Sequence, residues 1–397
     1  MRNLVYAPLA GLLIRVNVAE LKDLENAALG LPASEESVEL WNRLRAKEPV
    51  LECSTPESID ELTILLNQRC NFSCSYCYSA KGRSNAELDM PRISHVLDFF
   101  INRKRGRNLK IVFSGGGDPI LSFNRFQEAV SCAEKCAEKQ NVELVVGIVT
   151  NGSTLKDEYI RYLKEHQVQV VLSFDVLKDV HNKQRSHFDT VVNTICRMTE
   201  AGLPFGLRCT ITPLNVCRQN EMVETLHRDF PKVKSAAFEA VLSRELFKNE
   251  KDQETFYDFF VRHFFKAQAL AEQYGIEIGN TIANSVECCK IRACLGKFVV
   301  TPEGSFMACS RSSMPKEPYY DLFKYGNVDA TGLHIDHFKY NQLMEKNAEY
   351  YVECGTCIAR WHCGGGCLLA RQILTGRMSS YCRFMRRMII ETLKRRT

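Results

Sequence analysis

Three cysteines fall within eight residues of the segment RCNFSCSYCYSA, residues 69–80. Cys70, Cys74 and Cys77 follow a Cys-x3-Cys-x2-Cys pattern, with no fourth Cys or His close by in the sequence. A structural zinc site takes four protein ligands, often from paired Cys-x2-Cys units. An iron–sulfur cube also has four corners, so three thiolates bind three of its irons. The pattern therefore favours a [4Fe–4S] cluster whose fourth iron stays open for a small molecule.

Eight further cysteines with regular spacing lie in the last third of the chain. Eight thiolates are the full ligand set of two [4Fe–4S] clusters. Two zinc sites with four cysteines each need the same number, so the count leaves both alternatives open. These cysteines are Cys288, Cys294, Cys309, Cys354, Cys357, Cys363, Cys367 and Cys382, with Cys289 beside the first of them.

Six other cysteines lack the spacing of metal ligands, and we interpret them as packing residues. They are Cys53, Cys132, Cys136, Cys196, Cys209 and Cys217.

The composition is that of a soluble globular protein. Of its 397 residues, 45% are hydrophobic and 25% are charged, and the net charge of +5 is too small to indicate nucleic-acid binding. No apolar stretch approaches 18 residues, and the N-terminal segment lacks the pattern of a signal peptide. We therefore expect a cytoplasmic protein with no membrane partner, in which thiols stay reduced and serve metals.

The elements that must position these cysteines alternate between strands and helices from residue 61 onward. Short apolar runs such as LKIVFS and ELVVGIVT end in polar or glycine-rich segments, and helical segments separate them. Six such units predict a parallel sheet with outer helices, and ligands of such folds bind at the carboxyl ends of the strands. We expect an α/β fold with an open, partial (β/α)6 barrel.

We expect three regions along the chain. Residues 1–60 form a small α/β lead-in, with a hairpin turning at Pro8 and Gly11 and a helix starting near Ser34. This lead-in either binds a peptide or only covers the barrel. Residues 61–280 form the barrel. Residues 281–397 form a separate domain, short of strands and organised by metal.

The cysteine loop and the segments after the strands resemble the radical SAM superfamily. Its hallmark is Cys-x3-Cys-x2-Cys with an aromatic residue before the last cysteine, and GGGDP (115–119) resembles its GGEP motif with an aspartate in place of glutamate. TNG (150–152), SFD (173–175), DVLKDVHNKQR (175–185) and GLRCTITPLN (206–215) resemble further family segments, although Val176 stands where glycine is usual. The resemblance implies S-adenosylmethionine (SAM) contacts at Tyr76, Gly116, Gly117, Asp118, Asn151, Ser173, Asp175 and Arg208.

The resemblance also implies the chemistry. SAM binds the open iron of the cluster, and one electron from the cluster cleaves SAM to a 5′-deoxyadenosyl radical that abstracts a hydrogen atom from the substrate. An electron donor such as flavodoxin or ferredoxin is implied as a partner. The protein has to position the substrate and exclude water.

The C-terminal cysteines, including the run CGGGC (363–367), resemble the SPASM extension of radical SAM enzymes. The resemblance to the anaerobic sulfatase maturases, which share this spacing, implies three [4Fe–4S] clusters. Two of them are auxiliary clusters that relay electrons or only stabilise the fold. By that resemblance one auxiliary cluster takes Cys288, Cys294, Cys309 and Cys367. The other takes Cys354, Cys357, Cys363 and Cys382.

SPASM proteins act mostly on peptides, and three functions compete. The first is a peptide maturase that crosslinks side chains of a ribosomally made precursor peptide, by a carbon–carbon or thioether bond. The second is an anaerobic sulfatase maturase that forms formylglycine, and the third is a non-catalytic electron-transfer protein. Sulfatase maturases carry an aspartate where this chain has Ser310, which has no carboxylate, so we favour the first. Glu239 and Asp118 are candidate bases.

Overall fold

The N-terminal residues form a small module of their own. The computed structural model describes residues 3–45, 54–102, 104, 106–294, 296–348 and 352–396. Strands β1 (Asn3–Ala7) and β2 (Leu12–Val16) pair antiparallel, with Gly11 in a left-handed conformation after the turn. The predicted hairpin is confirmed. Helix α2 (Glu35–Leu44) begins after Ser34 as predicted, whereas α1 (Val18–Leu29), capped by Asn17 and Glu20, was not predicted.

The described residues also form one sheet of eleven strands in the order β13-β12-β11-β10-β3-β4-β5-β6-β7-β8-β9. From β10 to β9 all neighbours pair in parallel, and β10 to β13 pair antiparallel. The sheet is open, since β9 and β13 are its two edges. The parallel strands are β3 (Glu61–Ile64), β4 (Asn108–Phe113), β5 (Glu143–Thr150), β6 (Gln169–Ser173), β7 (Phe205–Ile211), β8 (Ser235–Ala240), β9 (Glu277–Gly279) and β10 (Phe298–Val300).

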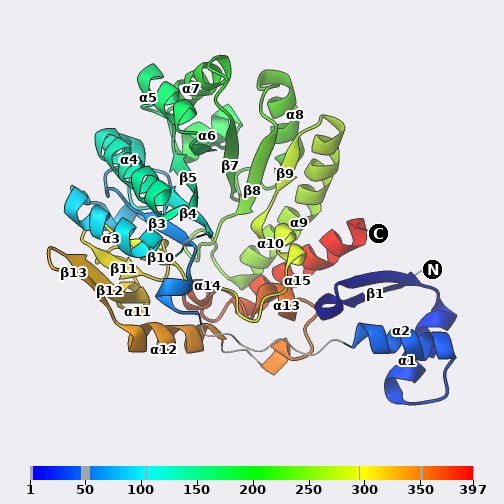
Figure 1. Ribbon diagram of the computed structural model, residues 1–397. Coiled ribbons are helices and arrows are strands. Elements are labelled where there is room, and N and C mark those ends of the chain that lie inside the picture. The colour runs from blue at the N-terminus through cyan, green and yellow to red at the C-terminus, as the bar shows by residue number, and fades with distance from the viewer. Residues whose placement is uncertain are drawn as a thin grey trace.

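Helices follow most of the parallel strands and cover the outer side of the curved sheet (Figure 1). The predicted α/β alternation is confirmed, while β9 and α6 add elements that were not predicted. In the part of the chain that the structure describes, no helix is both long and apolar enough to cross a membrane. The helices are α3 (Met90–Asn102), α4 (Phe123–Gln140), α5 (Asp157–Glu165), α6 (Lys178–Gln184), α7 (Phe188–Glu200), α8 (Gln219–Asp229), α9 (Glu250–Gln273) and α10 (Thr281–Asn284).

Side chains alternate between the two faces of each strand, and this separates core from site. Leu62 and Ile64 of β3 and Phe113 of β4 are fully buried in the hydrophobic core. The residues between them, such as Thr63 and Lys110, line a cavity on the other face. The polar residues of the strands therefore lie together inside the curve of the sheet.

The C-terminal segment is not short of strands, and that prediction was wrong. Strand β10 pairs in parallel with β3, with Phe298 opposite Leu62, and β11 (Ser305–Met307), β12 (Lys324–Asp329) and β13 (Gly332–Ile335) extend the same sheet. Several of these strands are only three or four residues long, too short for periodicity to identify. Their place in the barrel sheet ties the segment to the barrel. Its boundary at residue 281 stays a prediction.

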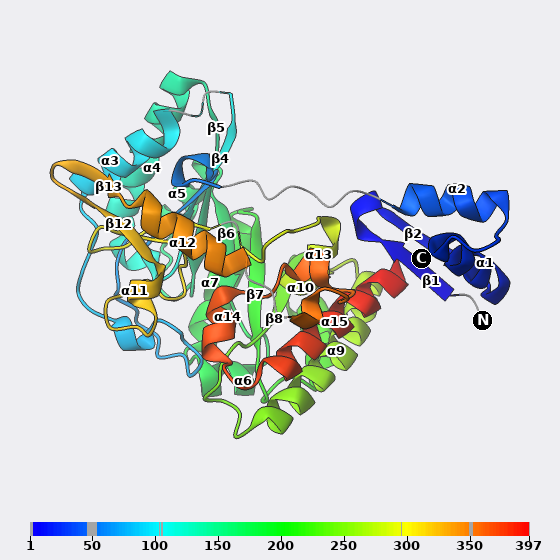
Figure 2. The ribbon, with the colours of Figure 1, turned by 90° about the horizontal axis from the view of Figure 1, so that it is seen from below.

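The last helix also joins the two regions. Helix α15 (Met378–Arg395) packs beside α9, and Gln253 Nε2 of α9 donates a hydrogen bond of 2.7 Å to Ser380 Oγ of α15 (Figures 1 and 2). The remaining helices of the segment are α11 (Tyr320–Phe323), α12 (His337–Ala348), α13 (Arg360–Cys363) and α14 (Leu368–Ile373).

The N-terminal hairpin contacts the C-terminal segment directly. Tyr6 and Leu13 pack against a buried apolar cluster of Val286, Ala359, Ile389 and Leu393. The Tyr6 hydroxyl lies 2.5 Å from Nε2 of His362, and the two rings stack. Figure 2 shows the hairpin beside the end of α15. The lead-in therefore docks near the C-terminal cysteines.

Candidate active site

A cavity of about 610 Å³ occupies the inner face of the sheet. This volume is typical of a small-molecule or cofactor site. Its walls come from three places: the cysteine loop after β3, the segments that follow the next strands, and the C-terminal segment. Residues that line it include Cys70, Cys74, Cys77, Gly116, Gly117, Asp118, Asn151, Ser173, Arg208, Glu239, Ser310, Arg311 and Cys367.

The three thiols of the cysteine loop share one wall of this cavity. Burial raises the pKa of Cys74 to about 11, with Arg185 opposing and the neighbouring thiols Cys77 and Cys70 adding to the rise. Arg83 Nη2 lies 3.6 Å from Cys77 Sγ as a donor. Three half-buried thiols that influence one another, beside a cationic donor, fit the ligands of one iron–sulfur cluster. Binding a cluster would remove their protons.

The glycine-rich loop after β4 packs directly on the cysteine loop. Gly117 N–H donates to Asn67 O at 2.9 Å, and Asp118 N–H donates to Arg69 O at 2.7 Å. A Cβ atom on Gly117 would lie 1.9 Å from Arg69 O, far inside any real contact. Only glycine allows this approach, so the two loops that the sequence motifs identify meet at one end of the sheet.

Asp118 connects the glycine-rich loop to the end of β5. Its carboxylate accepts hydrogen bonds from Thr150 Oγ1 at 2.8 Å and from the N–H groups of Asn151 and Ile120 at 2.7 and 3.1 Å. Burial raises the pKa of Asp118, and these donors oppose the rise. Both oxygens are occupied, so the arrangement supports a bracing role rather than that of a free base. Sequence reasoning missed Thr150 as its partner.

Asn151 reaches from the same strand end back to the cysteine loop. Its Nδ2 donates to Asn71 Oδ1 at 2.9 Å and lies 3.8 Å from Cys70 Sγ. Asp118 holds the backbone N–H of Asn151, and the side chain of Asn151 therefore lies against the thiol of Cys70.

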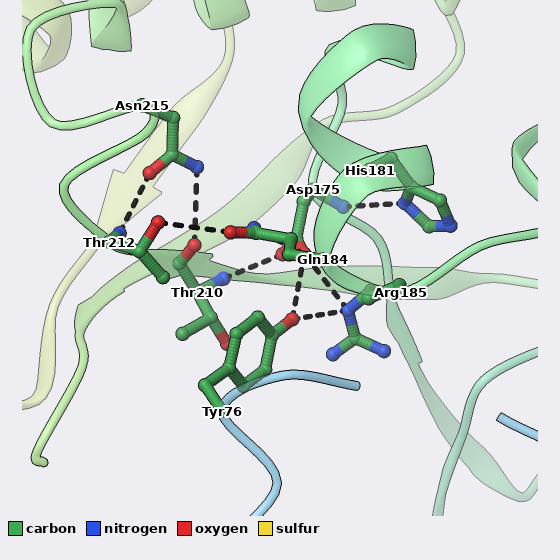
Figure 3. Close-up of polar contacts among 8 residues, drawn as sticks. All are labelled: Tyr76, Asp175, His181, Gln184, Arg185, Thr210, Thr212 and Asn215. Carbon is green, nitrogen blue, oxygen red and sulfur yellow. Dashed lines mark hydrogen bonds and ion pairs between the residues drawn. The ribbon is translucent and has the colours of Figure 1, made fainter. Parts of the chain in front are cut away.

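Asp175 lies at the centre of a buried polar network (Figure 3). It has no exposed surface, and its Oδ2 accepts from Tyr76 Oη at 2.7 Å and from Arg185 Nε at 3.0 Å. Oδ2 also accepts from Gln184 Nε2 at 2.7 Å, while Oδ1 accepts from Thr210 N–H at 2.9 Å. Asp175 does not line the cavity, in contrast to the prediction of a direct SAM contact, because protein donors occupy both of its oxygens. It holds Tyr76 and Arg185, which do line the cavity.

The same network extends away from the cavity. Thr212 Oγ1 donates to Gln184 Oε1 at 2.9 Å, and Asn215 Oδ1 accepts from Thr212 N–H at 2.7 Å (Figure 3). His181 Nδ1 accepts from Asp175 N–H at 3.2 Å, and burial lowers the pKa of His181 to about 4. The run 175–185 pointed to this region, but Gln184 and Arg185 had no predicted role.

Val176 occupies a backbone position that suits glycine. Its φ of 60° lies in the left-handed region, where a β-branched residue is strained. The backbone at this position therefore has a conformation that glycine adopts readily, although the chain carries valine there.

Two further predicted contacts, Ser173 and Arg208, line the cavity. Among the contacts of the described residues, the Arg208 guanidinium has no hydrogen bond or ion pair. Glu239 also lines the cavity, but its oxygens accept from Thr281 N–H at 2.9 Å and from Asn280 Nδ2 at 3.2 Å. Arg208 is thus a cation without an anionic partner among the described residues. Glu239, in contrast, already accepts hydrogen bonds from neighbouring residues.

The C-terminal thiols fall into two groups. Burial raises the pKa of Cys363 to about 12, and Cys382, Cys354 and Cys357 add to this rise. Burial likewise raises the pKa of Cys309 to about 11, with contributions from Cys367 and Cys294. The pKa of Cys363 thus responds to the three other thiols of one predicted ligand set, and that of Cys309 to two thiols of the other; the sets themselves stay a prediction.

Cys288 and Cys289 lie at the surface beside the hairpin. Both are exposed, and Cys289 Sγ lies 3.2 Å from Pro8 O. Within the described ranges, no three His, Cys, Asp or Glu side chains converge closely enough for a single metal ion. Cys53 lies outside those ranges.

The CGGGC run places one thiol of the second group at the cavity. Gly364 is left-handed, and a Cβ atom there would lie 2.3 Å from the carbonyl carbon of Arg292. This close approach brings the loop against the segment that carries Cys294. Cys367, at the end of the run, lines the central cavity together with Ser310 and Arg311.

Comparison with known proteins agrees with this geometry. Residues 64–229 match the Radical SAM superfamily. The cysteine-type anaerobic sulfatase-maturating enzyme of Clostridium novyi (strain NT) is 21% identical over 347 residues, which are 78% of this chain and 88% of that protein. The sporulation killing factor maturation protein SkfB of Bacillus subtilis (strain 168) is 27% identical over 168 residues, which are 41% and 38% of the two chains.

A solved structure shares the fold. Native anSMEcpe with bound AdoMet and Kp18Cys peptide superposes with a TM-score of 0.71 at 19% identity, over 84% of this chain and 98% of that chain. The matched residues 64–229 contain the three-cysteine loop, the glycine-rich loop and Arg208. Residues 64–229 therefore form a region that matches the Radical SAM superfamily and holds these parts of the site.

Proposed function

We propose that this protein uses SAM and a [4Fe–4S] cluster at Cys70, Cys74 and Cys77 to modify a ribosomally made peptide, by oxidative crosslinking of its side chains. One observation carries the proposal. The three thiols, the glycine-rich loop and the unpaired Arg208 line a single cavity, together with Cys367 of the C-terminal segment.

Each part of the chain has a task in this proposal. The three thiolates bind the cluster, and the Arg208 guanidinium pairs with the carboxylate of SAM. Asp118 braces the glycine-rich loop, and Asp175 holds Tyr76 and Arg185 at the cavity wall. When bound, the cluster and SAM supply a 5′-deoxyadenosyl radical that abstracts one hydrogen atom from the substrate. The crosslink loses a second hydrogen as a proton and an electron, and an oxidised electron acceptor takes that electron.

The peptide class rests on the relatives. Two of them are named for maturing a sulfatase and a sporulation killing factor, and the structural neighbour was solved with a peptide. Crosslinking is favoured over formylglycine formation because Ser310 follows Cys309, where sulfatase maturases carry aspartate. The cavity wall at this place offers a guanidinium, that of Arg311, instead of a carboxylate.

Formylglycine formation is the second candidate. It is favoured by the length of the match, which covers 78% of this chain and 88% of the Clostridium novyi enzyme. The match with SkfB covers only 41% of this chain.

We further propose two auxiliary [4Fe–4S] clusters in a SPASM domain over residues 281–397. The grouping of the C-terminal thiols supports two sites, and Cys367 brings one of them to the cavity. A cluster held by Cys367 and its partners would lie at the cavity wall, where it could take up the electron that the substrate loses. Residues 1–60 are a candidate peptide-binding region, since the β1–β2 hairpin pairs with no other strand among the described residues.

Anaerobic reconstitution with SAM and a reductant tests the function. The substrates are the peptide of a short open reading frame beside the gene and, separately, a sulfatase-derived peptide. We expect 5′-deoxyadenosine, and a first peptide that has lost two hydrogens and whose fragment ions stay joined across two residues. Cys74→Ser is the inactive control. Formylglycine in the second peptide would support the alternative, and a lack of 5′-deoxyadenosine would refute both.

A further inference from the structure

Besides Arg208, a second cation of the cavity, Arg311, has no ion pair among the described residues. Arg311 is half-buried, and its guanidinium carbon lies 5.4 Å from the centre of the Tyr78 ring. Among the contacts of the described residues, its guanidinium has no hydrogen bond and no ion pair. By contrast, Arg185 in the same cavity pairs with Asp175 at 3.0 Å.

The acidic side chains of the cavity do not fill this role. The carboxylate oxygens of Glu61 lie 3.8 Å from Nζ of Lys110 and 3.8 Å from Nζ of Lys297. Asp118 and Glu239 accept hydrogen bonds from their own neighbours. The proposed function uses Arg208 for the single carboxylate of SAM, so Arg311 remains available for another ligand.

A second, independent observation lies beside Arg311. Tyr257 of α9 is only 2% exposed and lines the cavity, yet its hydroxyl has no hydrogen-bond partner among the described residues. Burial raises the pKa of Tyr257, and the nearby Arg311 charge opposes that rise. Buried hydroxyls normally have a partner, so an orphaned one at a cavity wall indicates a ligand acceptor.

A third donor comes from the neighbouring helix. Tyr381 of α15 also lines the cavity, and its ring meets that of Tyr257 edge-on with centres 5.9 Å apart. Helices α9 and α15 pack side by side (Figure 2). Tyr257 and Tyr381, one from each helix, both line the cavity. Arg311, which is two residues after Cys309 in the sequence, adds a positive charge to the same cavity.

We propose that Arg311, Tyr257 and Tyr381 form a subsite that binds a carboxylate of the substrate peptide. This inference rests on the proposed function. One guanidinium balances one carboxylate, and two hydroxyls donate to its remaining lone pairs. The subsite holds an acidic group of the peptide next to Cys309 and Cys367. Two sources share this chemistry: the side chain of Asp or Glu, and a C-terminal carboxylate.

Three synthetic pentapeptides separate these sources by equilibrium dialysis against the reconstituted holoenzyme with SAM. The first is acetyl-Gly-Gly-Glu-Gly-Gly-amide, and the second has Gln in place of Glu. The third carries Gln and a free C-terminal carboxylate. We expect one carboxylate probe to bind about tenfold or more tightly than the neutral probe. The probe that binds more tightly shows whether the subsite accepts a side-chain carboxylate or a C-terminal carboxylate.

Variants test the residues. Arg311→Gln should remove the preference, Arg311→Lys should keep part of it, and Tyr257→Phe should weaken it several-fold. Arg262→Gln is the matched control, since this arginine also lies over a ring, that of Phe259 at 5.8 Å, but does not line the cavity. Arg262→Gln should keep the full preference.

Three results overturn the proposal. They are equal binding of all three probes, a preference that survives Arg311→Gln, and loss of peptide-independent 5′-deoxyadenosine formation in Arg311→Gln, which would assign Arg311 to SAM. The proposed function is judged separately. A wild-type enzyme that forms no 5′-deoxyadenosine refutes that function, whereas the dialysis result does not depend on turnover.

Discussion

At the scale of single residues, the wall of the cavity depends on buried side chains that do not line it. Asp175 is completely buried and binds four donors, among them the guanidinium of Arg185, which is 8% exposed. A buried charge without its partner is costly, so each member of the pair needs the other. Through this pair the segment after β6 fixes Tyr76 of the cysteine loop.

Asp175→Asn should therefore destabilise the protein strongly. The substitution keeps the size of the side chain but leaves the Arg185 charge buried and unpaired, which costs about 3–5 kcal/mol. Urea unfolding under anaerobic conditions measures the loss. The control is Asp189→Asn, whose carboxylate pairs with Lys178 at 2.8 Å on the surface and contributes at most about 1 kcal/mol. Equal losses in the two variants would contradict the role of the buried pair.

His181 should make stability depend on pH. Its pKa is lowered from 6.5 to about 4 by burial, so the unfolded chain gains a proton between these values that the native protein does not bind. Stability is thus complete above pH 6.5 and falls as the pH falls toward 4, by about 3 kcal/mol. Unfolding curves across this range measure the slope.

The comparison for this slope is His181→Asn, whose amide oxygen replaces the ring nitrogen as acceptor and does not titrate in this range. Its stability should fall less steeply than that of the wild type between pH 6.5 and 4. Parallel slopes would show that other groups cause the dependence.

At the scale of elements, strand-end loops support one another. The glycine-rich loop after β4 packs on the backbone of the cysteine loop, and Asp118 joins it to the end of β5. Parallel strands bring their carboxyl ends to one edge of the sheet, so residues 70, 117 and 151 meet although they are far apart in the chain. The loops form one surface, and a shift of one moves the others.

Gly117→Ala should disrupt this surface. The new Cβ atom would lie 1.9 Å from Arg69 O, so the cysteine loop has to move. We expect a loss of about 1–3 kcal/mol in stability, and a loss of iron and SAM binding, measured by iron content and equilibrium dialysis. The matched control is Gly147→Ala in β5, where the nearest atom lies at 3.6 Å. Full iron content in Gly117→Ala would contradict the proposed contact.

At the scale of the whole molecule, one continuous sheet connects the two cysteine-rich regions. Strand β10 pairs with β3, the strand that leads into the cysteine loop, and the cavity includes Cys367 as well as Cys70. The C-terminal segment thus contributes to the wall of the cavity, and one of its thiols, Cys367, lies there.

The proposed three clusters predict about 12 irons per reconstituted chain. Cys382→Ser should lower this to about 8, because it breaks only the group with Cys354, Cys357 and Cys363. Elemental analysis measures iron and zinc together. Cys196→Ser, at an exposed thiol of α7, should keep the full iron content. About 4 irons together with about two zinc ions per wild-type chain would contradict the auxiliary clusters.

The sequence by itself predicted the candidate cluster ligands and determined the alternation of elements. Cysteine spacing is local, so the loop at residues 70–77 and the groups near the C-terminus were visible without coordinates. Apolar strands and amphipathic helices also carry their periods within a few residues, and the parallel sheet followed from them. The hairpin at Pro8 and Gly11 is local in the same sense and was predicted.

Only the tertiary structure decided which distant residues meet. The three-residue strand β10 has no period to detect and exists because β3 offers it an edge. Asp175 is a residue type that often binds ligands through its carboxylate. Only the structure shows that buried protein donors occupy this carboxylate and that it holds Tyr76. Tyr257, Arg311 and Tyr381 share no sequence motif. They come together because α15 packs on α9 beside the cavity, and such contacts depend on burial and shape rather than on neighbours in the chain.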